Sequence, residues 1–203
     1  MIPIVQQPEP ATFTAKVRIP GKAFLKKKPN PTSEDFKKAK AQYWNRSLDD
    51  LTKAYKNICA YCCFYLPLEG SVDHFKPKTK HPTLAYEWSN FRLAHSKINS
   101  YKGNSETVLD PFNIQPGWFV LDFTNFHVRA NPTGAANIRT QVEETIRVLR
   151  LNLDDSLVKF RFSIVRDYSK GDITMNFLET HYPFIAAELK RQAKQHSIKG
   201  IIP

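Results

Sequence analysis

Apolar residues in the last third of the chain recur at the spacing of α-helices. Two stripes show this period, the first made by Val142, Thr145, Ile146, Leu149 and Leu153 and the second by Leu157, Phe160, Ile164 and Tyr168. A further apolar run follows Gly171 and contains Pro183, and each of these residues interrupts a helix. The pattern therefore predicts a helical part over about residues 139–196, broken near Gly171 and Pro183.

The first quarter of the chain carries two different patterns. Residues 1–32 contain six prolines and the run Lys26-Lys27-Lys28. Because proline removes an amide donor and opposes a long helix, we expect an extended, basic, proline-rich arm over residues 1–32. Residues 33–57 instead predict two helices, since Ser33 and Ser47 are good N-cap residues that precede apolar side chains at helical spacing.

The middle of the chain has the pattern of short strands and loops. Residues 104–138 are rich in loop signals, with a strand expected at 118–123 and a turn at 131–134. A length of 203 residues suits one domain, with or without an appendage. The sequence therefore predicts an arm followed by a single α+β domain over residues 33–203.

The charge of the chain is strongly positive. Thirty Lys and Arg residues stand against 19 Asp and Glu residues, which gives a formal net charge of +11. Such an excess favours a polyanionic partner, most often nucleic acid; the alternative is a solvated basic surface.

No stretch reaches the roughly 18 apolar residues of a membrane span. Three closely spaced cysteines and no signal-like start lead us to expect a protein of the reducing cytoplasm without a membrane partner.

One set of polar residues has the composition needed to cleave a phosphodiester bond. Such a reaction needs an activated water, a cation that neutralises developing charge, and rigid geometry. Asp73 and His74 are adjacent, so on a regular strand they point to opposite faces. We therefore expect the strand to end at this pair, with Pro77 closing it. A carboxylate and the amide oxygen of Asn99, at the start of a helix, would suit Mg²⁺.

The same residues resemble a known family. The pair Asp73-His74, followed by Asn90 and by Asn99-x-x-Lys102-Gly103, is similar to the motif of the HNH endonucleases, which have a ββα-metal fold. Segments 84–94, 108–112 and 145–152 resemble a bacterial branch that includes the PtuB-like HNH proteins of the anti-phage Septu systems and of some retrons. The resemblance implies a ββα-metal core over about residues 58–105, flanked by N-terminal and C-terminal helices.

The resemblance also implies a role for each residue of the motif. His74 matches the general base that takes a proton from water. Asp73 and Asn99 match the two protein ligands of a Mg²⁺ or Mn²⁺ ion. Asn90 matches the residue that orients the loop carrying the histidine, and Lys102 matches a helix lysine that lies near the phosphate.

A structural zinc is less well supported. Many relatives carry a second C-x-x-C before the last Asn, and here those positions are His95 and Ile98. Cys59, Cys62 and His95 supply three ligands, whereas zinc takes four in a tetrahedron. The ligand count disfavours zinc, and the alternative is that the cysteines are small buried apolar residues.

The function predicted from these residues is metal-dependent endonuclease cleavage of DNA. Lys76, Lys78, Lys80 and Arg92 are candidate phosphate contacts, with a solvated basic turn as the alternative. The branch resemblance implies an anti-phage effector with an ATPase partner subunit. The alternative function is a nucleic-acid-binding or assembly subunit with a degenerate, non-catalytic nuclease core.

Overall fold

The computed structural model describes residues 1–68 and 70–192, and it confirms the α+β class. The chain divides into two compact units. The hairpin unit consists of Val5–Ala60 and Leu66–Glu106; the helical unit consists of Met1–Ile4, Tyr61–Tyr65 and the described residues from Thr107 onward. Across the described residues, no helix has the length and apolar character needed to span a membrane.

The hairpin unit begins with a helix where the sequence predicted an extended arm. A π-helical turn, η1 (Thr14–Arg18), continues directly into α1 (Ile19–Lys27). Pro20 is the second residue of α1, a position at which its missing N–H is tolerated. The Lys16 carbonyl, four residues earlier, accepts a hydrogen bond from Arg46 Nη1 at 3.2 Å. The prediction was wrong for this segment because the wide turn and Arg46 accommodate the proline.

Two short helical segments follow, close to the predicted positions. Helix α2 (Ser33–Lys38) starts in a capping box between Thr32 and Asp35. A 3₁₀ turn, η2 (Tyr43–Ser47), leads into α3 (Leu48–Ala54). The Ser47 hydroxyl donates to the Trp44 carbonyl at 2.6 Å, so it stabilises the 3₁₀ turn and not the start of α3.

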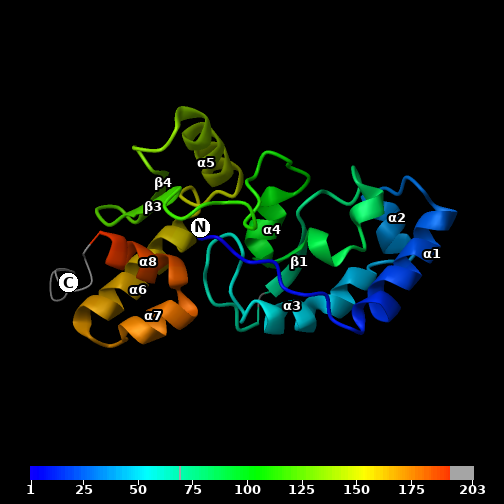
Figure 1. Cartoon of the computed structure of the whole chain (residues 1–203), viewed down its shortest axis with the longest axis horizontal. Helices are drawn as coiled ribbons and strands as arrows, with labels where there is room; N and C mark the ends of the chain where they lie inside the picture. Colours follow the sequence, from blue (N-terminus) through cyan, green and yellow to red (C-terminus); the bar gives the residue numbers. More distant parts are fainter. Residues whose placement is uncertain (69, 193–203) are drawn as a thin grey trace. The chain divides into compact units, whose positions relative to one another are not determined.

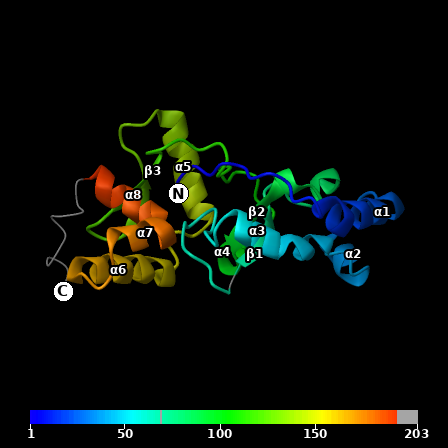
Figure 2. The same cartoon turned by 60° about the horizontal axis from the view of Figure 1, so that its bottom comes forward.

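The centre of the hairpin unit is a β-hairpin followed by a helix. Strand β1 (Gly70–His74) pairs antiparallel with β2 (Phe91–His95), and α4 (Ser96–Lys102) follows β2 directly. Helices α3 and α4 both contact the two strands (Figure 2). Two 3₁₀ turns, η3 (Pro82–Leu84) and η4 (Trp88–Asn90), lie in the connection between the strands. Strand β1 ends at His74, as the Asp-His pair predicted.

An aromatic cluster joins the N-terminal helices to the hairpin. The Trp44 ring lies 5.4 Å from the Phe36 ring and 5.8 Å from the Tyr86 ring, measured between centroids. The Tyr86 hydroxyl donates to the Ala41 carbonyl at 2.7 Å. Gly21 of α1 lies against the Tyr86 ring so closely that an added Cβ would be 2.2 Å from its Cγ. The N-terminal helices thereby form one wall of the core that carries β1.

The helical unit has a second hairpin and four helices. Strand β3 (Phe119–Asp122) pairs with β4 (His127–Ala130), as shown in Figure 1. The helices are α5 (Ala136–Val148), α6 (Asp155–Lys170), α7 (Met175–His181) and α8 (Pro183–Arg191). The strand near 118–123 and the breaks at Gly171 and Pro183 are confirmed. Residues 193–196 of the predicted helical part lie outside the described residues.

Side chains close both outer edges of the β3–β4 hairpin. The Leu121 N–H donates to Glu188 at 2.8 Å, and its carbonyl accepts from Gln192 at 2.7 Å. On the other strand, Asn152 bonds the N–H and the carbonyl of Val128 at 2.8 and 2.7 Å. These amide and carboxylate groups take the place of neighbouring strands, so a two-stranded sheet satisfies its central backbone groups.

Candidate functional site

A polar pocket of about 450 Å³ lies along β1 in the hairpin unit. Four consecutive residues, 71–74, line it, although their side chains alternate between the two faces of the strand. The pocket therefore runs along the edge of β1 that does not face β2. The other lining residues are Ser33, Lys37, Gln42, Trp44, Asn45, Pro77, Lys78, Asn99, Gly103 and Asn104.

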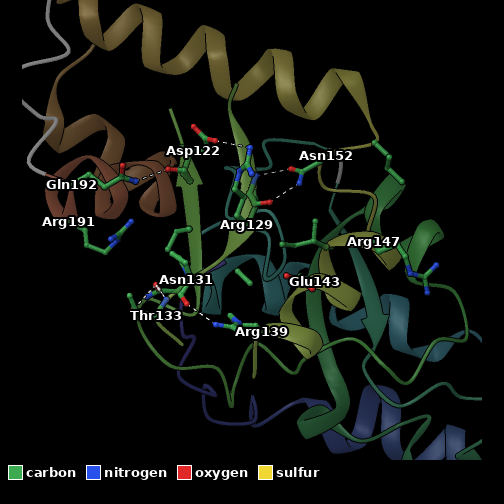
Figure 3. A pocket seen from close by; sticks show the side chains of 17 residues that line it. Asp122, Arg129, Asn131, Thr133, Arg139, Glu143, Arg147, Asn152, Arg191 and Gln192 are labelled. Atoms are coloured by element: carbon green, nitrogen blue, oxygen red, sulfur yellow. Dashed lines mark hydrogen bonds and ion pairs between the residues drawn. The ribbon is translucent and has the colours of Figure 1, made fainter. Parts of the chain in front are cut away.

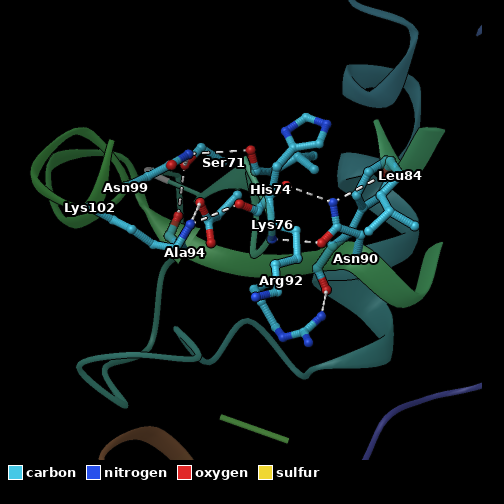
Figure 4. A network of polar contacts seen from close by, with 12 residues as sticks. Ser71, His74, Lys76, Leu84, Asn90, Arg92, Ala94, Asn99 and Lys102 are labelled. Carbon is cyan, nitrogen blue, oxygen red and sulfur yellow. Dashed lines mark hydrogen bonds and ion pairs between the residues drawn. The ribbon is translucent and has the colours of Figure 1, made fainter. Parts of the chain in front are cut away.

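Asp73 is buried and forms an ion pair with Lys102. The carboxylate is 2% exposed, and Lys102 Nζ lies 3.0 Å from its Oδ1. The same ammonium donates to the His74 carbonyl at 2.8 Å. Lys102 thus reaches from the end of α4 back to β1, as Figure 4 shows. It holds the end of the strand, whereas the family resemblance implied a place near a phosphate.

His74 is held between aromatic rings with a defined tautomer. Its Nε2 lies 2.9 Å from the Ala85 carbonyl oxygen. Because a carbonyl only accepts hydrogen bonds, Nε2 carries the proton and Nδ1 carries the lone pair. The Trp44 and Phe91 rings pack edge-on against the imidazole at 4.8 and 5.2 Å.

Burial keeps the His74 imidazole neutral. Its pKa is lowered from 6.5 to about 3, chiefly by burial and secondly by the positive charge of Lys78. The hydrogen bond to Ala85 acts in the opposite direction, and Lys102 lowers the pKa further. At neutral pH the side chain is therefore a proton acceptor in the same pocket as Asp73.

Asn90 holds the loop that follows β1. Its Oδ1 accepts from the Lys76 N–H at 2.8 Å, and its Nδ2 donates to the carbonyls of Lys76 and Leu84 at 3.0 and 3.1 Å (Figure 4). These bonds fix both ends of the loop that starts after His74. This is the geometry expected of a residue that orients the histidine.

Asn99 faces β1 from α4. Its Nδ2 donates to Ser71 Oγ at 3.0 Å and to the Val72 carbonyl at 3.3 Å. This orientation turns Oδ1 away from the two acceptors on the strand. The amide oxygen is the atom that a Mg²⁺ site would require, and Asn99 lines the same pocket as Asp73.

The four basic residues predicted as phosphate contacts lie in different environments. Lys78 lines the pocket, and Lys76 is half-buried. Lys80 forms an ion pair with Glu106 at 3.1 Å. Arg92 is 2% exposed, and its Nη1 donates to the backbone carbonyls of residues 89 and 91 at 2.8 and 2.9 Å. The expectation for Arg92 is corrected, because a buried guanidinium bound to the backbone does not reach a polymer in solvent.

The candidate zinc ligands have other structural roles. Cys59 Sγ accepts a hydrogen bond from the His95 N–H at 3.3 Å, and His95 Nδ1 accepts from the Lys97 N–H at 3.2 Å, which caps α4. Cys59 and His95 belong to the hairpin unit, and Cys62 belongs to the helical unit. Within residues 1–68 and 70–192, no three His, Cys, Asp or Glu side chains are grouped so that they could hold a metal ion.

Sequence reasoning missed the contribution of the N-terminal segment to the pocket. Lys37, Gln42 and Asn45 line it, and Trp44 covers His74. Ser33 and Lys37, which both line the pocket, belong to α2. No pattern in the sequence places α2 and η2 at a pocket along β1, because that placement depends on packing between residues far apart in sequence, such as Trp44 and His74, which are 30 positions apart.

A larger pocket of about 1120 Å³ lies in the helical unit (Figure 3). Arginine side chains are prominent in its lining, but most are matched by carboxylates. Arg129 pairs with Asp122 at 2.9 Å, and Arg191 pairs with Glu188 at 2.8 Å. Arg139 donates to the Pro132 carbonyl at 2.9 Å. These contacts stabilise the walls of the pocket and leave little unbalanced charge for chemistry.

Asp73, the neutral His74 and Asn99 all line the smaller pocket, which makes it the candidate functional site. Part of the chain is similar to the Septu protein PtuB of Bacillus thuringiensis. The two sequences are 29% identical over 117 residues, which cover 56% of this chain and 44% of that protein. The match therefore spans less than half of the relative. No family model matches the chain.

Proposed function

We propose that this protein is a metal-dependent endonuclease of the HNH type that hydrolyses phosphodiester bonds in DNA. The observation that carries the proposal is the meeting of Asp73, His74 and Asn99 at one pocket, from a strand and a helix that are separated in sequence. The hydrogen bonds of Asn90 to the loop after β1 support it.

His74 is the proposed general base. Its Nδ1 lone pair takes a proton from water, and the water oxygen attacks phosphorus while the bond from phosphorus to the leaving oxygen breaks. The leaving oxygen takes a proton from solvent. A nearby phosphate anion favours the protonated imidazole, so substrate raises the pKa of His74 from its low value and makes it a stronger base.

Asp73 and Asn99 are the residues that would hold Mg²⁺ or Mn²⁺. A carboxylate and an amide oxygen suit such a hard cation, which keeps several water ligands. When bound, the ion supplies neutralisation of the charge that develops on the phosphate oxygens. Lys102 holds the Asp73 carboxylate through Oδ1, and Ser71 and Val72 hold the Asn99 amide.

A plasmid-nicking assay with Mg²⁺ or Mn²⁺ tests the proposal. We expect the wild type to convert supercoiled plasmid to nicked or linear forms, and His74→Ala to be slower by a factor of about 100 or more. Lys38→Gln, on the exposed surface of α2, serves as a control with wild-type rates. Absence of metal-dependent cleavage of DNA or RNA by the wild type, alone and with its native partner, would overturn the enzyme proposal.

One observation favours a second function. The buried Asp73–Lys102 ion pair already neutralises the carboxylate without a metal. A binding or assembly subunit with a degenerate nuclease core would retain such a pair. Calorimetric titration with Mn²⁺ separates the two functions: Asp73-dependent binding supports the nuclease, and equal heats for the wild type and Asp73→Asn support the second function.

The similarity to the Septu protein PtuB supports a role in anti-phage defence with a partner subunit. On this proposal the chain is an effector whose ATPase partner determines when it cuts. Phage plating on cells that carry the complete native system tests the role. We expect His74→Ala in this chain to abolish protection, and unchanged protection would contradict it.

A further inference from the structure

Two lysines from separate elements flank the polar pocket along β1. Lys37 belongs to α2, and Lys78 belongs to the turn after β1. Both line the same pocket as Asp73 and His74. We propose that Lys37 and Lys78 form a phosphate clamp that receives the backbone of a nucleic-acid strand. The inference rests on the proposed function and identifies how that site holds its substrate.

The position of Lys78 is fixed by the aromatic wall of the pocket. Its Nζ lies 5.3 Å from the centroid of the Trp44 ring, a cation–π distance. The same ring contacts the His74 imidazole at 4.8 Å between centroids. Lys78 and His74 therefore contact the same aromatic ring and line the same pocket, so a phosphate bound by Lys78 would lie in the pocket that holds the proposed base.

The charges of the pocket are unbalanced without an anion. Of the described residues that line it, Asp73 is the single carboxylate, and Lys102 already pairs with it at 3.0 Å. Lys37 and Lys78 add two further positive charges. Burial, followed by the opposing effect of Asp73 and the repulsion of Lys102 and Lys37, leaves the pKa of Lys78 below its usual value. A bound phosphate offsets this repulsion, because its negative charge favours the protonated form of Lys78.

The remaining lining offers groups that can bind the backbone of a strand. Gln42, Asn45 and Asn104 offer amide groups, and Ser33 and Ser71 offer hydroxyls. Such neutral donors commonly contact phosphate and sugar oxygens, which carry no direct sequence information. Trp44 is the one Phe, Trp or Tyr among the described residues of the lining, and it packs against His74 and Lys78, so it is already engaged by the protein.

Binding of fluorescent single-stranded and duplex DNA, measured in EDTA over a salt series, tests the clamp without cleavage. We expect Lys37→Gln and Lys78→Gln each to weaken binding several-fold at low salt. Each substitution should reduce the slope of log affinity against log salt by about one, the effect of one lost phosphate contact. Lys78→Arg should keep the wild-type slope, because it keeps the charge.

Lys38→Gln is the matched control, since it removes the same charge from the next residue of the same helix. Its side chain is 77% exposed and lies near Glu34. Wild-type affinity and slope are expected for it. Thermal unfolding of each variant checks that the fold is kept. If Lys37→Gln behaves like Lys38→Gln, the clamp is wrong.

The outcomes separate the clamp from the nuclease proposal. Binding that depends on Lys37 and Lys78, in a protein that never cleaves, supports the clamp and refutes the nuclease. Cleavage that is equally fast in Lys37→Gln and Lys38→Gln, with equal binding, supports the nuclease and refutes the clamp. Inorganic phosphate that competes as strongly as an oligonucleotide of equal phosphate content would show a small-anion site and overturn strand binding.

Discussion

His74 owes its neutral state to the residues packed around it. The unfolded chain has an ordinary histidine pKa near 6.5, whereas burial lowers the folded pKa to about 3. At pH values between about 3 and 6.5 the unfolded state binds the proton more readily than the folded state. Protonation of His74 therefore favours unfolding as the pH falls through this range. We predict that metal-free wild type loses stability relative to His74→Asn as pH falls from about 6.5 towards 3. Thermal unfolding in EDTA measures the difference, and a pH-independent difference would contradict it.

The Asp73–Lys102 pair is another local feature with a measurable effect. Lys102→Met leaves a carboxylate buried without its ammonium partner. We predict a loss of about 3–5 kcal/mol in the free energy of unfolding of the metal-free protein. The double variant Asp73→Asn/Lys102→Met should recover a large part of the lost free energy of unfolding, because neither charge of the pair then remains buried. Urea unfolding of the wild type, Asp73→Asn, Lys102→Met and the double variant gives the coupling energy, and additive effects would show that the pair contributes little.

At the scale of elements, α1 depends on a glycine. An added Cβ at Gly21 would overlap the Tyr86 ring, which is 1% exposed and bound to the Ala41 carbonyl. We predict that Gly21→Ala lowers the free energy of unfolding by about 1–3 kcal/mol, even though alanine favours helices. The measurement is denaturant unfolding beside Gly21→Ala/Tyr86→Leu, in which the smaller leucine side chain should reduce the loss caused by the added Cβ. Equal stability of Gly21→Ala and the wild type would refute the close packing.

Elements whose limits depend on local chemistry could be predicted from the sequence. The end of β1 at His74, β3 within 118–123 and the breaks at Gly171 and Pro183 follow from residue type and alternation. The helix over residues 14–27 could not be predicted, because Arg46 supplies a donor to the Lys16 carbonyl from 30 positions away. The local preference of a segment for helix or extended structure does not decide its conformation where a distant side chain hydrogen-bonds to its backbone.

The same distinction applies to the candidate site. Adjacent residues and short spacings drew attention to Asp73, His74, Asn90 and Asn99, and the structure brings three of them to one pocket. The roles of long basic side chains could not be predicted in the same way. Arg92 is buried and Lys102 turns back to β1, because the direction of a flexible side chain depends on its packing partners.

At the scale of the whole molecule, the net charge of +11 governs encounters with nucleic acid. We predict similar affinities for duplexes of unrelated sequence, with steep weakening as salt rises. Lys37→Gln/Lys78→Gln should lower the salt slope by about two while leaving further salt dependence from other basic residues. Mobility-shift titrations measure both quantities. Strong preference for one sequence would contradict recognition through the backbone.

The two units are also linked by the path of the chain. The helical unit includes Tyr61–Tyr65, which lie far in sequence from its helices. Phe64 is buried and packs on Phe160 and Tyr182, with ring centroids 4.9 and 6.1 Å apart. The Tyr65 N–H donates to the His181 carbonyl at 2.9 Å. A fragment that starts at Thr107 therefore lacks part of its own core.

We predict that such a fragment does not unfold cooperatively, and that Phe64→Ala in the full chain costs about 3–5 kcal/mol. Near-ultraviolet circular dichroism and thermal unfolding test the fragment, and urea unfolding tests the variant. Tyr65→Ala is a useful comparison, because it keeps the backbone N–H that bonds His181 and should cost less. A fragment with a sharp transition near that of the full chain would show that residues 61–65 are dispensable. Their contacts would then add little to the helical unit, and the chain could be divided at Glu106 for separate study of each unit.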